Sequence, residues 1–126
     1  MDASAFLAQL YGEAPAAPGK PINTAGALVP VIWRIEVLNS FLMALRRDRF
    51  TPVQMDRIVT EFLSLDIDTD GDPVEDRRIL ELGRQYRLTA YDATYLELAF
   101  RRNLPLATLD AELQQAARRA GVPLIA

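Results

Sequence analysis

The sequence predicts an α/β fold in which a mostly parallel central sheet is flanked by helices. Three observations lead to this fold class. Short apolar runs alternate with longer segments of helical periodicity, as they do in β–α units. Half of the residues are hydrophobic and a quarter are charged, which is the balance of a globular protein. The length suits one domain over residues 1–126, and no linker or internal repeat divides the sequence.

The N-terminal part is expected to form a helix, a loop, a strand and a second helix, in that order. Residues 1–11 are rich in alanine and leucine, which favours a short helix. Residues 12–26 carry three prolines and predict a loop. Residues 27–30 are an apolar run fit for a short strand. Residues 31–49 have apolar side chains at intervals of three and four and arginines at the C-terminal end, which predicts a long helix.

The middle of the sequence predicts two helices separated by a strand. Thr51 followed by Pro52 is a strong start signal, and the helix is expected to end near residue 63. Residues 65–68 alternate between apolar and acidic, which indicates a short strand. Proline again follows a capping residue at Asp72, so a helix is expected from there to residue 86.

The C-terminal part predicts a helix, a strand, a helix and an edge strand. A helix is expected over residues 89–103 and a compact apolar strand over 104–109. A further helix is expected over residues 110–120, with Gly121 as its C-cap. Residues 122–125 complete the prediction as an edge strand. The alternation of strands and helices is what favours a parallel sheet.

The composition excludes several kinds of active site. The sequence contains neither cysteine nor histidine. Thiol nucleophiles, Ser-His-Asp triads and zinc sites with histidine or thiolate ligands are therefore ruled out within this chain. Carboxylates, hydroxyls, amides and arginines remain. If the protein is an enzyme, an all-oxygen site for a hard cation such as Mg²⁺ or Mn²⁺ is expected.

Charge gives no bulk support for nucleic-acid binding, because the net charge is −3. All basic residues except Lys20 are arginines, and many occur in pairs, so local anion-binding patches remain possible beside solvated helix surface. About 20 consecutive apolar residues are needed to span a bilayer, and no such stretch is present. The N-terminus also lacks the basic start of a secretory signal, so a cytoplasmic protein is expected.

One acidic segment resembles a calcium-binding loop but lacks its essential ligand. Asp66, Asp68 and Asp70 precede Gly71 in the pattern that opens an EF-hand loop. The twelfth position of such a loop must supply a bidentate glutamate, and here it is Arg77. Calcium binding is therefore rejected at this segment.

Four other carboxylates lie in contexts that do not suit solvated charges: Asp2, Glu36, Asp92 and Asp110. In a parallel sheet the C-terminal ends of strands and the starts of helices share one edge, where ligands bind. Asp92, Asp110 and plausibly Glu36 map to that edge. Clustered carboxylates repel one another unless a cation neutralises them. Each has a structural alternative, because Asp92 and Asp110 could be helix N-caps and Glu36 could pair with an arginine such as Arg34.

Four segments resemble the PIN domain of VapC-type toxins. They are residues 2–8 (DASAFLA), 29–39 (VPVIWRIEVLN), 89–99 (TAYDATYLELA) and 106–117 (LATLDAELQQAA). They occur in the order of the family and span nearly the whole chain. The resemblance implies a PIN-like three-layer fold and a Mg²⁺- or Mn²⁺-dependent endoribonuclease that acts as a toxin, is inhibited by a cognate antitoxin and is often a homodimer.

The same resemblance assigns the site residue by residue. The catalytic, metal-holding carboxylates are implied to be Asp2, Glu36, Asp92 and Asp110. Three neighbours are expected to orient metal-bound water or touch the substrate: Ser4, Asn39 and Thr108. Ser4 and Thr108 could equally be helix caps. Arginines 46, 47 and 101 are offered as contacts for the RNA backbone.

The sequence departs from the family at its start. The family normally has a hydrophobic strand before the first aspartate, and only Met1 precedes Asp2 here. The first strand is therefore expected to be missing or truncated. This departure motivates an alternative function, a catalytically impaired PIN-like interaction protein that lacks a complete metal site.

Overall fold

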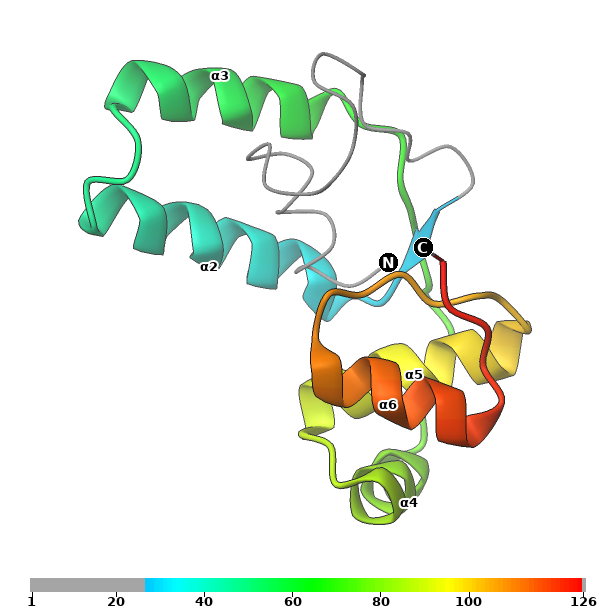
Figure 1. Cartoon of the computed structure of the whole chain (residues 1–126). Coiled ribbons are helices and arrows are strands. Elements are labelled where there is room, and N and C mark those ends of the chain that lie inside the picture. The colour runs from blue at the N-terminus through cyan, green and yellow to red at the C-terminus, as the bar shows by residue number, and fades with distance from the viewer. Residues whose placement is uncertain (1–26, 126) are drawn as a thin grey trace.

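The computed structural model describes residues 27–125, which form two short strands and five helices in these bounds: β1 (Leu28–Val29), α2 (Ile32–Arg46), α3 (Pro52–Leu63), β2 (Asp68–Thr69), α4 (Asp76–Tyr86), α5 (Ala90–Arg102) and α6 (Ala111–Ala120). The helix and loop expected over residues 1–26, and the missing first strand, lie outside the described residues. The antiparallel pair α2–α3 extends to one side of the strands, and α4, α5 and α6 lie on the other (Figure 1).

The pair α2–α3 is held together by aromatic packing. Trp33 and Phe41 are buried on one face of α2, and both contact Phe62 of α3. The ring centroids of Phe41 and Phe62 are 5.5 Å apart in an edge-to-face arrangement, which adds to the gain from burial. Helix α3 starts as expected, because Thr51 and Gln54 form a reciprocal capping box before Pro52. Helix α2 ends earlier than expected, where Asp48 adopts a left-handed φ of 52°.

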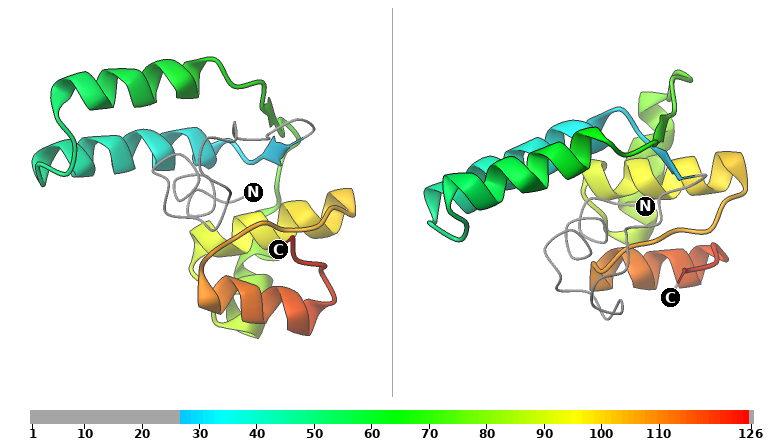
Figure 2. Two further views of the ribbon diagram at one scale, coloured as in Figure 1. Left: turned by 45° about the horizontal axis from the view of Figure 1, so that its top comes forward. Right: turned by 90° about the horizontal axis from the view of Figure 1, so that it is seen from above.

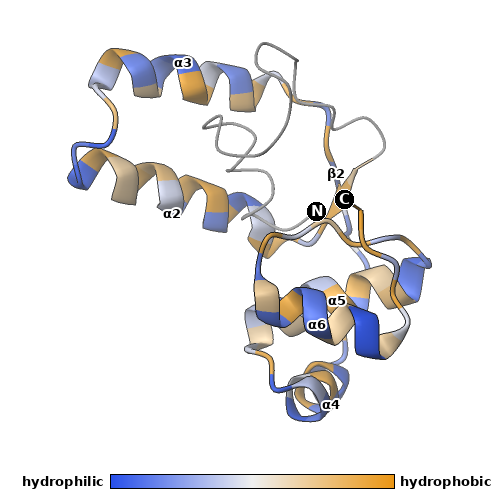
Figure 3. Ribbon diagram, viewed as in Figure 1, coloured by the Kyte–Doolittle hydropathy of each residue, from blue (hydrophilic) through white to orange (hydrophobic). Residues whose placement is uncertain are grey.

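Apolar residues recur along the whole of α2 (Figure 3). Besides its buried residues, the helix exposes Ile35, Leu38, Leu42 and Leu45, at intervals of three, four and three residues. This spacing places the four side chains along one stripe of the helix. We call these four residues the α2 stripe.

The sheet is smaller than the sequence predicts. Strands β1 and β2 pair in parallel, with Leu28 opposite Asp68, so the second strand lies slightly later than expected. The strands expected over 104–109 and 122–125 are reduced to one parallel bridge between Leu106 and Leu124. The prolines at positions 105 and 123 cannot donate to a ladder, which explains the short pairing. The α/β class is confirmed, and the described residues show a small parallel sheet between helices.

The last three helices follow the prediction closely, with one late start. Helices α5 and α6 have the expected bounds to within one residue, and Gly121 ends α6 with a φ of 76°. Helix α4 begins at Asp76 rather than near Asp72. The Asp72 carboxylate is instead bound to arginines of α5, so this segment runs past the end of that helix before α4 starts. Among residues 27–125, no helix is both long and apolar enough to cross a membrane.

Candidate active site

Three of the predicted carboxylates come from neighbouring helix starts. Glu36 lies in the second turn of α2, Asp92 in the first turn of α5, and Asp110 directly before α6. The N-terminal ends of α5 and α6 lie at the same end of their layer (Figure 1), and seen from above α5 lies between α6 and α2 (Figure 2). Helix N-terminal ends carry partial positive charge, so this end of the molecule favours anionic groups.

Glu36 is held against α5 by a hydrogen bond. The hydroxyl of Tyr95 donates to Oε1 of Glu36 at 2.8 Å, across 59 residues of sequence. Tyr95 is buried and belongs to the same helix as Asp92, three residues later, so the two side chains share one face of α5. The bond therefore brings Glu36 to the face of α5 that carries Asp92. Arg34, the partner considered from the sequence, lies over the ring of Phe62 at 4.8 Å.

The carboxylate of Asp92 is not the cap of its helix. Thr89 is the N-cap of α5, and its hydroxyl oxygen accepts the backbone N–H of Asp92 at 3.1 Å. The structural alternative for Asp92 is therefore wrong. A carboxylate in the first turn is favoured by the helix dipole, but no capping role requires it here.

Asp110 does cap its helix. Its Oδ1 accepts the backbone N–H of Leu113 at 2.8 Å. The turn before it is fixed by the buried Thr108, whose hydroxyl oxygen accepts the N–H of Asp110 at 3.0 Å and whose carbonyl accepts from the Gln114 side chain. Capping uses one oxygen of the carboxylate, and a carboxylate has a second one with which to bind a cation.

The other predicted site residues make none of these contacts or lie outside the described residues. Asn39 is exposed, one turn beyond Glu36 on α2. Asp2 and Ser4 lie outside the described residues. Within residues 27–125, no group of three or more acidic side chains lies close enough together to hold a metal ion. The donor set formed by Glu36, Asp92 and Asp110 is nevertheless all oxygen, which is the chemistry that Mg²⁺ and Mn²⁺ require.

Tyr95 is a site residue that the sequence reasoning missed. It lies in the segment that resembles the PIN domain, and it reads there as an ordinary core aromatic. The available signal was its spacing of three residues from Asp92, which places both on one helix face. The partner on α2 could not be found from spacing, because the contact is long-range.

A separate ionic cluster occupies the other end of α5, and it removes Arg101 from the residues expected to contact RNA. Arg101 binds the carboxylates of Asp70, Asp72 and Glu97, and Arg102 binds Asp70 and Asp72. The hydrogen bond from Arg101 holds the pKa of the buried Asp70 below its usual value, against the effect of burial, and the bond to Asp70 raises the pKa of Arg101. Asp70 is thus an ion-pair partner, which agrees with the rejection of a calcium loop.

Comparisons with known proteins concern the family and the fold. The family model described as the PIN domain matches residues 1–119. No curated protein matches the chain. The crystal structure of PAE2754 from Pyrobaculum aerophilum is similar, with a TM-score of 0.66 over 91% of this chain and 82% of that chain, at 22% sequence identity. At this identity the structural likeness shows the fold alone.

Proposed function

This chain belongs to the PIN domain family, whose members are generally metal-dependent nucleases, and we propose that it is a Mg²⁺- or Mn²⁺-dependent endoribonuclease that acts in the cytoplasm as a toxin. The observation that carries the proposal is the contact between Tyr95 and Glu36, which brings a carboxylate of α2 to the face of α5 that bears Asp92. Asp110 begins the adjacent helix at the same end of the layer.

The residues present suit this chemistry. Glu36, Asp92 and Asp110, joined by Asp2, would hold the cation. A bound divalent ion lowers the pKa of a coordinated water and offsets the charge of a phosphodiester. Tyr95 orients Glu36, and the capping bond of α6 holds Asp110, so hydrogen bonds position both carboxylates in the absence of substrate. The starts of α5 and α6 offer partial positive charge to the phosphate.

Adding Mn²⁺ is expected to raise the melting temperature of the chain, because the cation binds the folded state alone. The chain with Tyr95→Phe should need roughly tenfold more Mn²⁺ for the same shift, since groups that orient metal ligands typically contribute 10- to 100-fold in affinity. Thermal melts across a Mn²⁺ titration measure both. A melt in buffer that contains a chelator and no added Mn²⁺ is the reference. A melting temperature that does not change when Mn²⁺ is added would instead favour the alternative function, an interaction protein without a complete metal site.

The α2 stripe supports the proposed antitoxin partner. Its four apolar side chains are between 36% and 69% exposed, and they begin at Ile35, next to Glu36. The stripe ends beside Arg46 and Arg47, which are exposed and have no ion pair among the described residues. An amphipathic antitoxin segment with acidic residues at one end would match this surface. Its other end could place an arginine among the carboxylates in place of the cation. A homodimer stays a prediction.

Leu42→Glu is expected to weaken binding of the antitoxin about 30-fold or more while leaving RNA cleavage unchanged. Leu42 lies within the stripe and is 51% exposed, so the charge disturbs a docking surface rather than the core. A hot-spot residue at the centre of an interface contributes about 2 kcal/mol or more, which is about 30-fold in affinity. The measurement is the affinity of the purified chain for its cognate antitoxin.

Leu80→Glu on α4 is the matched control, because Leu80 is 59% exposed and lies on another element. Equal loss of the partner in both variants, or full retention with Leu42→Glu, would contradict docking on the α2 stripe.

A further inference from the structure

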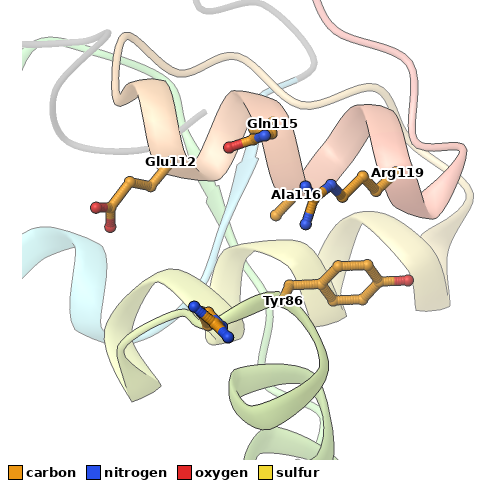
Figure 4. Close-up of a pocket in the computed structure, with 6 residues that line it drawn as sticks. Tyr86, Glu112, Gln115, Ala116 and Arg119 are labelled. Atoms are coloured by element: carbon orange, nitrogen blue, oxygen red, sulfur yellow. The ribbon is translucent and has the colours of Figure 1, made fainter.

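A groove separates the end of α4 and the turn after it from helix α6 (Figure 4). Its volume is about 450 Å³. Six residues line it: Tyr86, Arg87, Glu112, Gln115, Ala116 and Arg119. Arg119 and Ala116 point from α6 toward the ring of Tyr86, and Glu112 lies at the other end, near the start of α6. The lining is mainly polar, with hydrogen-bond donors on both walls.

Two arginines of this groove have no ion-pair partner among the described residues. Arg87 and Arg119 line the groove from its two walls, and neither guanidinium has a hydrogen bond or ion pair among residues 27–125. Arg87 ends α4 with a left-handed φ of 54°, which fixes its backbone at the turn. Tyr86 adds a hydroxyl that accepts from Gln85 at 3.3 Å and so has its own proton to donate. Guanidinium, phenol and amide donors together suit an oxyanion.

The groove leads away from the candidate active site. Arg87 lies two residues before Thr89, the cap of the helix that bears Asp92. On the other wall, α6 starts after Asp110 and reaches Arg119 nine residues later, roughly 13 Å along the helix axis at 1.5 Å per residue. Glu112 occupies the end nearest Asp110. Arg87 therefore lies near the start of α5, and Arg119 lies at the far end of α6, so the two arginines are set along the groove.

We infer that this groove binds the phosphodiester backbone of single-stranded RNA beyond the point of cleavage, with Arg87 and Arg119 as the phosphate contacts. The inference rests on the proposed ribonuclease function and names the path of its substrate. An acidic overall protein can hold RNA in this way, because phosphate contacts act locally. Arginines that touch phosphates contribute affinity without choosing the base, so the groove adds length dependence rather than sequence preference.

Fluorescence anisotropy with a labelled single-stranded RNA of about a dozen nucleotides, in chelator to prevent cleavage, tests the inference. Each lost phosphate contact should reduce the steepness of log affinity against log salt by about 0.7. We expect the slope to fall by this amount for Arg119→Gln and for Arg87→Gln, and by about twice this amount for the double variant. The Kd should be roughly three- to tenfold weaker for each single variant. In cleavage assays KM should rise while kcat stays the same.

Arg118→Gln is the matched control, because Arg118 has the same charge on the same last turn of α6, is exposed, and does not line the groove. The affinity for an RNA too short to reach the groove should be the same in Arg119→Gln as in the parent. Unchanged salt dependence in both groove variants, or an equal change with Arg118→Gln, would overturn the inference. If the groove variants keep RNA binding and lose the antitoxin, the groove is a protein site instead. A parent chain that neither binds nor cleaves RNA would reject the ribonuclease function itself.

Discussion

Changing Asp92 to asparagine is expected to lower the rate of RNA cleavage by roughly a thousandfold or more, while the chain still folds. The substitution removes the charge that a hard cation requires but preserves the shape of the side chain. Transition-state stabilisation by a metal is worth several kcal/mol, and each 1.4 kcal/mol is about tenfold in rate. Because Thr89 caps α5, the start of that helix does not depend on the Asp92 carboxylate.

Asp110→Asn separates the two roles of Asp110 in the same assay. Asparagine caps helices about as well as aspartate, so the bond to Leu113 and the start of α6 should survive. Cleavage should nevertheless fall as it does for Asp92→Asn, because the neutral amide cannot replace a charged ligand. Time courses with Mg²⁺ and with Mn²⁺ measure the rate, and thermal melts confirm that the variants fold.

The control is Asp76→Asn, which makes the same change in the first turn of α4, away from the candidate site. It should cleave RNA like the parent. Cleavage that survives both Asp92→Asn and Asp110→Asn would mean that these carboxylates do not form the active site. A comparable loss with Asp76→Asn would show that the effect comes from net charge rather than from the site.

Helices were predictable because their signals are local. The capping box at Thr51 and the C-cap at Gly121 lie within a few residues of the helices that they delimit. The sheet was less predictable, because strand length depends on a partner elsewhere in the chain. Pro105 lies beside one half of the Leu106–Leu124 bridge and Pro123 beside the other, so two apolar runs that resemble strands share a single bridge.

The sequence proposes the candidate site as a set of residues and says less about its geometry. The three described carboxylates were chosen from their apolar surroundings and from a family resemblance, and their role stays a prediction. Sequence could not tell that Asp110 is a cap while Asp92 is not, because both lie near helix starts with polar neighbours. It also could not find the contact between Tyr95 and Glu36, or the bond between Arg101 and Asp70, since 59 and 31 residues separate these partners.

Arg101→Met is expected to destabilise the chain by about 3 kcal/mol or more, the largest stability effect that we predict. The substitution keeps most of the side-chain length but leaves two carboxylates without their main partner. The side chains of Asp70 and Glu97 are only 3% and 8% exposed. Asp70 keeps its ion pair with Arg102, but Glu97 keeps none of the ion pairs that the structure describes, and a buried charge left without its partner typically costs about 3–5 kcal/mol. Urea denaturation at neutral pH measures the loss as a shift of the midpoint at constant slope.

Arg78→Met is the matched control, because Arg78 and Glu81 form an ion pair whose side chains are 44% and 65% exposed. Exposed pairs contribute about 0–1 kcal/mol, so this variant should unfold almost like the parent. Equal destabilisation by both substitutions would contradict a special role for the cluster around Asp70.

Acid should weaken the same cluster in the parent chain. Arg101 holds the pKa of Asp70 below its ordinary value, so the folded state binds this proton less readily than the unfolded state does. The stabilisation is therefore complete above the ordinary pKa of aspartate, about 3.9, and is lost as the pH falls through the lower folded-state value. In Asp70→Asn this contribution is absent at every pH. The difference in unfolding free energy between parent and Asp70→Asn should therefore be constant near neutral pH and shrink below about pH 4; a difference that grows with acid would reverse the assigned sign.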